Sequence, residues 1–131
     1  MLLFDIRAAE YFRARDDSIL CELVHPDKSE ETAIRSLKCS IVHAIVPQGD
    51  QTLPHRLKNT TEIYYILSGS GEMHIEGEKA AVGKGMAVVI PPGAVQYIIN
   101  TGEERLEFIA VCDPAWKEED EEVLPASQED I

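Results

Sequence analysis

A histidine and a glutamate, His55 and Glu62, stand seven residues apart in LPHRLKNTTEIYY, residues 53–65. Imidazole nitrogens and carboxylate oxygens bind catalytic metals, and the same two groups also move protons in general acid–base catalysis. Leu57 lies where a second histidine would complete a chelating set, and its side chain cannot bind a metal. The stretch therefore predicts either a metal site that lacks a ligand or a polar pocket that works without metal.

A tyrosine follows the glutamate at strand spacing. Because side chains alternate along a strand, Glu62, Tyr64 and Ile66 should share one face, so Tyr64 should point inward if Glu62 does. Glu62 and Tyr64 are the candidates for moving a proton, and plain core packing is the alternative for Tyr64.

The other histidines are weaker candidates. His43 lies in SIVHAIV, a run that is apolar on both faces, where a hydrogen-bonded core histidine is more common than a ligand. His25 precedes a proline at the end of another run, and His74 falls on the polar face of an expected hairpin. We keep His43 and His25 as less favoured metal ligands, and we expect His74 to be solvated.

The elements that must position these groups are short strands. Apolar or alternating runs of four to nine residues, rich in Ile, Val and Tyr, are separated by turn signals such as SGSG, EGE, GKG and PPG. This pattern is typical of an antiparallel sandwich or barrel, and it places a hairpin turn near Gly77.

The two ends of the chain differ from this pattern. Residues 5–15 could form a short amphipathic helix packed on the barrel. Five consecutive acidic residues, 118–122, indicate a solvated face or tail, after which Val123 and Leu124 could dock and residues 126–131 should fray.

Length and charge limit the classes of function. The 131 residues suit one domain, and the net charge of −12 disfavours nucleic acid and anionic membrane surfaces as partners. The start of the chain lacks the pattern of a signal peptide, and no run reaches the length of a membrane span. The three cysteines, an odd number without CxxC spacing, are expected to be reduced and buried, and the protein is expected to be cytoplasmic.

Two spaced motifs run through the middle of the chain. The first is Gly49, five residues, His55, one residue, Leu57, four residues, Glu62, six residues and Gly69.

The second motif begins after 15 further residues. It is Gly85, five residues, Pro91, one residue, Gly93, two residues, Gln96, three residues and Asn100. The pair of motifs resembles those of small single-domain cupins (cupin type 2, conserved barrel), with Leu57 and Gln96 at two positions where that family has histidine.

The resemblance implies an all-β fold, an antiparallel jelly-roll β-barrel forming a single domain over residues 1–131. The barrel core should span about 38–113, with an acidic C-terminal extension at 117–131. It also implies a site in the barrel mouth and a homodimer.

For the site, the resemblance implies a metal held at positions 55, 57, 62 and 96, of which His55, Glu62 and Gln96 could donate. One imidazole, one carboxylate and one amide oxygen with waters would suit a divalent ion such as Mn, Fe, Co, Ni or Zn, with octahedral geometry favoured over tetrahedral zinc.

Two functions remain open. One is a metal-dependent enzyme acting on a sugar, hydroxy acid or similar small molecule. The other is a small-molecule binding or sensor protein that uses no metal and catalyses nothing. The barrel alone does not choose between them, because unrelated functions share it.

Overall fold

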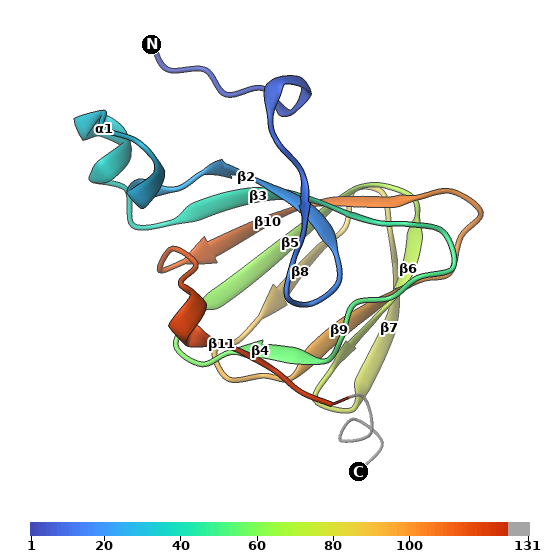
Figure 1. Ribbon diagram of the computed structural model, residues 1–131. Helices are drawn as coiled ribbons and strands as arrows, with labels where there is room; N and C mark the ends of the chain where they lie inside the picture. Colours follow the sequence, from blue (N-terminus) through green and yellow to red (C-terminus); the bar gives the residue numbers. More distant parts are fainter. Residues whose placement is uncertain (126–131) are drawn as a thin grey trace.

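The computed structural model describes residues 1–125 as two facing antiparallel sheets that form a jelly roll (Figure 1). The six-stranded sheet has the order β1-β2-β3-β10-β5-β8, and the five-stranded sheet has the order β11-β4-β9-β6-β7. The strands of the first sheet are β1 (Phe12–Arg13), β2 (Ile19–Val24), β3 (Ser40–Val46), β10 (Leu106–Asp113), β5 (Thr61–Ser68) and β8 (Ala87–Ile90). Those of the second are β11 (Glu121–Val123), β4 (His55–Leu57), β9 (Gln96–Asn100), β6 (Ser70–Ile75) and β7 (Glu78–Gly83). The all-β jelly roll expected from the sequence is confirmed.

Helical structure is short. There is one α-helix, α1 (Thr32–Arg35), within the described part of the chain, and three single turns of 3-10 helix, η1 (Ile6–Ala8), η2 (Pro26–Lys28) and η3 (Glu118–Asp120). None of the helices in residues 1–125 is long and apolar enough to cross a membrane.

The core lies between the sheets and follows strand alternation. In β5 the side chains of Glu62, Tyr64 and Ile66 are buried, whereas Ile63 and Tyr65 are exposed. Both sheets contribute to the apolar core, whose buried members are Val42, Ala44, Val46, Tyr64, Ile66, Met73, Val82, Ile90, Ala94, Ile98, Leu106, Phe108 and Ala110. Tyr64 therefore points inward beside Glu62, as its spacing predicts.

The hairpin of β6 and β7 reverses at Glu76 and Gly77, the position expected from the sequence. Ile75 pairs with Glu78, and both turn residues have positive φ, 49° for Glu76 and 82° for Gly77. Positive φ at both central residues is the signature of the type I′ turn, whose twist matches that of the flanking strands.

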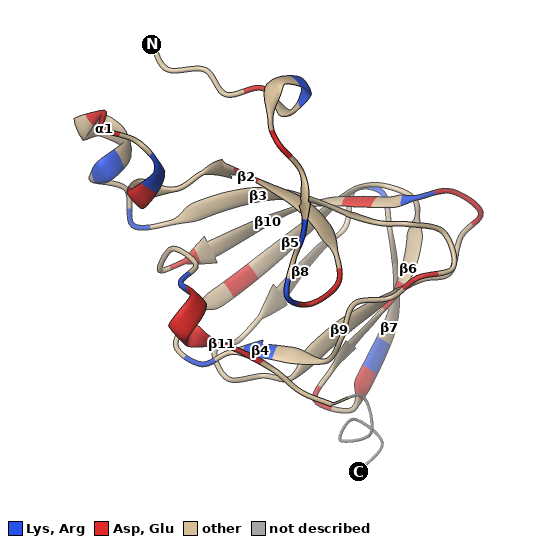
Figure 2. Cartoon of the chain, in the orientation of Figure 1, with Lys and Arg blue, Asp and Glu red and all other residues tan. Residues whose placement is uncertain are grey.

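The ends of the chain differ from expectation. Of the helix expected over 5–15 only the single turn η1 forms, and Phe12 pairs with Leu20 across β1 and β2. The acidic run is not a free tail: η3, coloured red in Figure 2, leads into β11, which pairs with β4. Asp120 explains this, because its carboxylate accepts hydrogen bonds from the Asn59 backbone at 2.9 Å and the Thr60 hydroxyl at 2.8 Å. The fraying expected for 126–131 falls outside the described residues.

The outer face of the six-stranded sheet carries exposed apolar side chains, Ile63, Tyr65, Leu67 and Val89. Such a face suits a partner surface, and the homodimer implied by the resemblance stays a prediction.

Candidate functional site

Glu62, His55 and Gln96 meet at one end of the barrel, between the sheets. Glu62 lies on β5 in the six-stranded sheet, and His55 and Gln96 are paired neighbours on β4 and β9 in the five-stranded sheet. All three are at least nine-tenths buried, at 8%, 2% and 1% exposure respectively. The fold thus brings together the three residues that the sequence selects.

A chain of hydrogen bonds links the inward side chains of Tyr64, Gln96 and Glu62. The Tyr64 hydroxyl donates to Gln96 Oε1 at 2.9 Å, and Gln96 Nε2 donates to Glu62 Oε1 at 2.6 Å. The Cys112 thiol lies 3.6 Å from Glu62 Oε2, across the β5–β10 pair. The side-chain carbonyl oxygen of Gln96 therefore accepts from Tyr64, and its amide nitrogen faces the carboxyl group of Glu62.

The carboxyl group of Glu62 is better suited to holding a proton than to carrying a charge. Burial raises its pKa, and the opposing effects of His55 and of the hydrogen bond from Gln96 are smaller. The same burial raises the pKa of Tyr64 well above its usual value, so its hydroxyl stays a donor.

One ring nitrogen of His55 is held by the backbone, and the other faces a carboxylate. The His55 Nδ1–H donates to the Leu53 carbonyl oxygen at 2.7 Å, which leaves Nε2 on the side of the cavity. Nε2 lies 3.5 Å from Asp16 Oδ2, and both residues line the cavity. A histidine held in this way can accept a proton or bind a metal.

The remaining donors do not fit the family's metal. Within residues 1–125, no three histidine, cysteine, aspartate or glutamate side chains converge on a point where an ion could be held. Leu57 has no donor atom, the oxygen of Gln96 already accepts from Tyr64, and burial raises the pKa of Glu62 and so opposes the ionised form in which it would ligate.

The less favoured histidines lie elsewhere. The ring of His43 is on the outer side of β3, where Nδ1 and the Tyr11 hydroxyl are 2.7 Å apart and Nε2 is 3.1 Å from Glu107. His25 Nε2 is 2.7 Å from the Trp116 carbonyl oxygen. The structure thus places neither histidine in the chain formed by Tyr64, Gln96 and Glu62.

His74 and Tyr97 also lie outside the barrel mouth. They stack on the outer face of the five-stranded sheet, with ring centroids 4.3 Å apart, and His74 is 2.7 Å from Glu72. Tyr97 thus points opposite to Gln96, as alternation predicts, whereas His74 is partly buried by the stacking and not simply solvated.

A cavity of about 90 Å³ adjoins His55 and Glu62. It is lined by Phe12, Ala14, Arg15, Asp16, Leu20, Glu22, Val42, His55, Leu57, Glu62, Cys112, Trp116 and Glu121. Most of these residues lie outside the two motifs.

The rim of the cavity comes from both ends of the chain. The turn between β1 and β2 contributes Arg15 and Asp16, and Asp16 is fixed by hydrogen bonds from the backbone and hydroxyl of Ser18. Arg15 donates to the Glu118 carbonyl at 3.1 Å and lies 3.6 Å from the carboxylate of Glu121. Burial raises the pKa of Glu121. Sequence reasoning missed these residues, because only tertiary structure brings them to the motifs.

Comparison with known proteins agrees with the fold. The Cupin domain family matches residues 42–112. The uncharacterized protein MJ1618 of Methanocaldococcus jannaschii is 36% identical over 129 residues, which cover 95% of this chain and 99% of MJ1618. The oxalate-binding protein of Thermotoga maritima is 36% identical over 66 residues, 50% of this chain and 54% of that protein.

A solved structure extends the likeness of the fold along most of the chain. A variant of Streptomyces PAC13, solved with uridine, superposes with a TM-score of 0.73 at 17% identity, over 95% of this chain and 92% of that chain. The match to the family model and the long alignment with MJ1618 lead to one assignment: this chain belongs to the cupin family.

Proposed function

We propose that this protein binds a small polar organic molecule in the cavity at the barrel mouth, using its own side chains and no metal. The observation that carries the proposal is the chain from Tyr64 through Gln96 to Glu62. Its hydrogen bonds engage Gln96 and Glu62, two of the positions at which the resemblance implies metal ligands.

The wall of the cavity supports binding and proton exchange. Glu62, whose pKa is raised by burial, can offer a proton to a ligand oxygen, and His55 Nε2 can accept one from a ligand hydroxyl. Leu57 lines the same cavity and gives the ligand an apolar contact. A few directed polar groups on an apolar wall are the usual composition of a small-molecule site.

The named relatives support a small ligand without identifying it. One related protein is called oxalate-binding, and one neighbour in fold was solved with uridine. Oxalate itself suits this cavity poorly, because four carboxyl groups and a single arginine line it. A dianion would meet repulsion here unless a cation accompanied it.

A thermal-shift screen in the presence of EDTA tests the proposal. Sugars, hydroxy acids, nucleosides and small amines are added to metal-stripped protein, with Ala14→Trp as the control. Ala14 lines the cavity. A tryptophan there should fill the mouth while leaving the backbone hydrogen bond from Ala14 to Ser18 in place.

The expected result is stabilisation by at least one compound class in EDTA, lost in Ala14→Trp. Stabilisation that occurs only with added Mn, Fe, Co, Ni or Zn would overturn the proposal in favour of a metal-dependent enzyme. Failure of every class to stabilise the wild type would overturn it as well.

A further inference from the structure

One cavity-lining carboxylate, that of Glu22, stands apart from the others. It projects from β2 beside Leu20, Val42 and Trp116, which line the same cavity. Its Oε1 is buried and accepts no hydrogen bond from the described residues. A buried acceptor without a donor costs stability, so an arriving donor at this point would recover free energy.

We propose that the cavity takes a small organic cation, and that Glu22 binds its ammonium group against the rings of Phe12 and Trp116. The inference rests on the proposed function, because it names the class of ligand for the same cavity. The ligand chemistry is a primary ammonium on a short apolar skeleton.

His25 lies beside Glu22 but does not donate a hydrogen bond to it. Its Nε2 is 3.5 Å from Glu22 Oε1, but the hydrogen on Nε2 is donated to the Trp116 carbonyl oxygen at 2.7 Å. Its Nδ1 accepts the Asp27 backbone N–H at 3.0 Å, which leaves no place for a second ring proton. Both ring nitrogens are thus engaged by the backbone, and neither donates a hydrogen bond to Glu22.

The surroundings of Glu22 suit an organic cation better than a hydrated ion. Phe12 and Leu20 form a cross-strand pair and line the cavity. Trp116, from the C-terminal part of the chain, lines the same cavity. The backbone of Trp116 is fixed on both sides, by the Ser40 hydroxyl at 2.9 Å and by His25. Aromatic faces attract a cation, and the apolar skeleton of an amine gains by burial.

The charges that line the cavity also favour a cationic ligand. Asp16, Glu22, Glu62 and Glu121 line it, and its one fully charged base, Arg15, is already bound by Glu121 and by backbone carbonyls.

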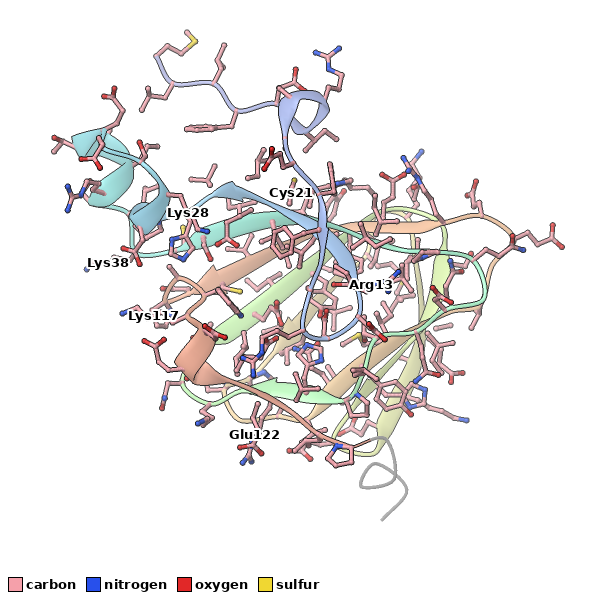
Figure 3. All side chains as sticks on the ribbon, in the orientation of Figure 1. Arg13, Cys21, Lys28, Lys38, Lys117 and Glu122 are labelled. Atoms are coloured by element: carbon pink, nitrogen blue, oxygen red, sulfur yellow. The ribbon has the colours of Figure 1, made fainter. Side chains whose placement is uncertain are left out.

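Lysine does not correct this balance. No lysine lines the cavity. The labelled Lys28, Lys38 and Lys117 all lie along one side of the molecule (Figure 3). Burial raises the pKa of Glu22, the opposing effects of His25 and Lys28 are smaller, and a bound ammonium would lower this pKa again.

Three ligands with one carbon skeleton test the inference. They are 3-methylbutan-1-amine, 3-methylbutan-1-ol and 3-methylbutanoate, which carry a positive, a neutral and a negative head group. Calorimetric titration in EDTA at pH 7.5 compares wild type with Glu22→Gln. Glu103→Gln is the control, since it removes an exposed acidic residue outside the cavity.

The amine should bind wild type at least about tenfold more tightly than the alcohol, and the carboxylate should not bind. Glu22→Gln should weaken the amine about ten- to a hundredfold and leave the alcohol unchanged, the range for a lost hydrogen bond to a charged group. Glu103→Gln should change neither. Urea unfolding of ligand-free Glu22→Gln should show no loss of stability, because Glu22 Oε1 accepts no hydrogen bond.

Equal affinity for amine and alcohol, an unchanged amine affinity in Glu22→Gln, or preferential binding of the carboxylate would overturn the inference. Each of these leaves the proposed function standing, because the cavity still takes a small molecule without metal. If none of the three binds, the inference fails, and the wider screen in EDTA decides the proposed function separately.

Discussion

Replacing Glu62 by glutamine isolates the proton-holding character of the site. The carboxyl group is 8% exposed, accepts a hydrogen bond from Gln96 at 2.6 Å and lies 3.6 Å from the Cys112 thiol. Glutamine keeps the shape and the acceptor that faces Gln96, but it cannot ionise. The substitution therefore removes one titration with little change in packing.

The raised pKa of Glu62 fixes the sign of the effect. Burial lifts this pKa in the folded protein above that of an unfolded glutamate, about 4.3, so unfolding releases a proton between the two values. In that window the titration of Glu62 lowers the free energy of unfolding of the wild type by up to about 1.4 kcal/mol for each unit that the pH rises. Glu62→Gln lacks this fall, so the variant should gain stability relative to wild type as pH rises, and the difference should level off above the folded pKa.

Urea unfolding followed by circular dichroism between pH 5.5 and 8 measures this difference. The range stays above the isoelectric point of about 4.6, near which association would interfere. Glu22 and Glu121, whose pKa values are also raised, titrate in both proteins and cancel in the comparison. A stability difference that is flat over this range, or that shifts toward the wild type as pH rises, would refute a proton-holding Glu62 and indicate a carboxylate stabilised by a cation.

Two further predictions test the fold and the hydrogen-bonded chain by the same unfolding measurement. Gly69→Ala should destabilise by several kcal/mol or prevent folding, because φ is 88° and the new Cβ would lie 2.7 Å from the Arg105 carbonyl oxygen. Gly77→Ala, at φ 82° with open space around it, is its control and should cost only about 1–2 kcal/mol; equal losses would contradict the steric argument. Tyr64→Phe should cost about 1–3 kcal/mol beyond its small packing change, because Gln96 Oε1 loses its donor, and an unchanged stability would show that the bond is not formed in solution.

The parts of the fold that could be predicted are those set by local sequence patterns, namely strand alternation and turn residues. Strand alternation correctly placed Tyr64 inward, and the turn residues correctly located the hairpin at Gly77. The ends of the chain could not be read in this way. The acidic run becomes ordered because Asp120 finds donors on Asn59 and other residues about 60 positions away, and sequence periodicity carries no signal for such a contact.

The candidate site could likewise be predicted only in part. The motif spacing selected His55, Glu62 and Gln96, which the structure brings together. It did not show that Gln96 turns its amide nitrogen toward Glu62, since that orientation is decided by the Tyr64 hydroxyl on the other sheet. Nor did it find Glu22, which looks like an ordinary surface residue of an alternating strand until the tertiary fold buries it.

A titration of Mn²⁺ into the EDTA-treated and dialysed protein tests the central claim, a site that works without metal, most directly. Leu57→His/Gln96→His restores both histidines that the resemblance implies and serves as the positive control. The wild type should show no saturable stoichiometric binding, with heats equal to those of His55→Ala, whereas the double variant should acquire a site. A one-to-one isotherm for the wild type that disappears in His55→Ala would contradict the account and show that His55 and Glu62 hold a metal.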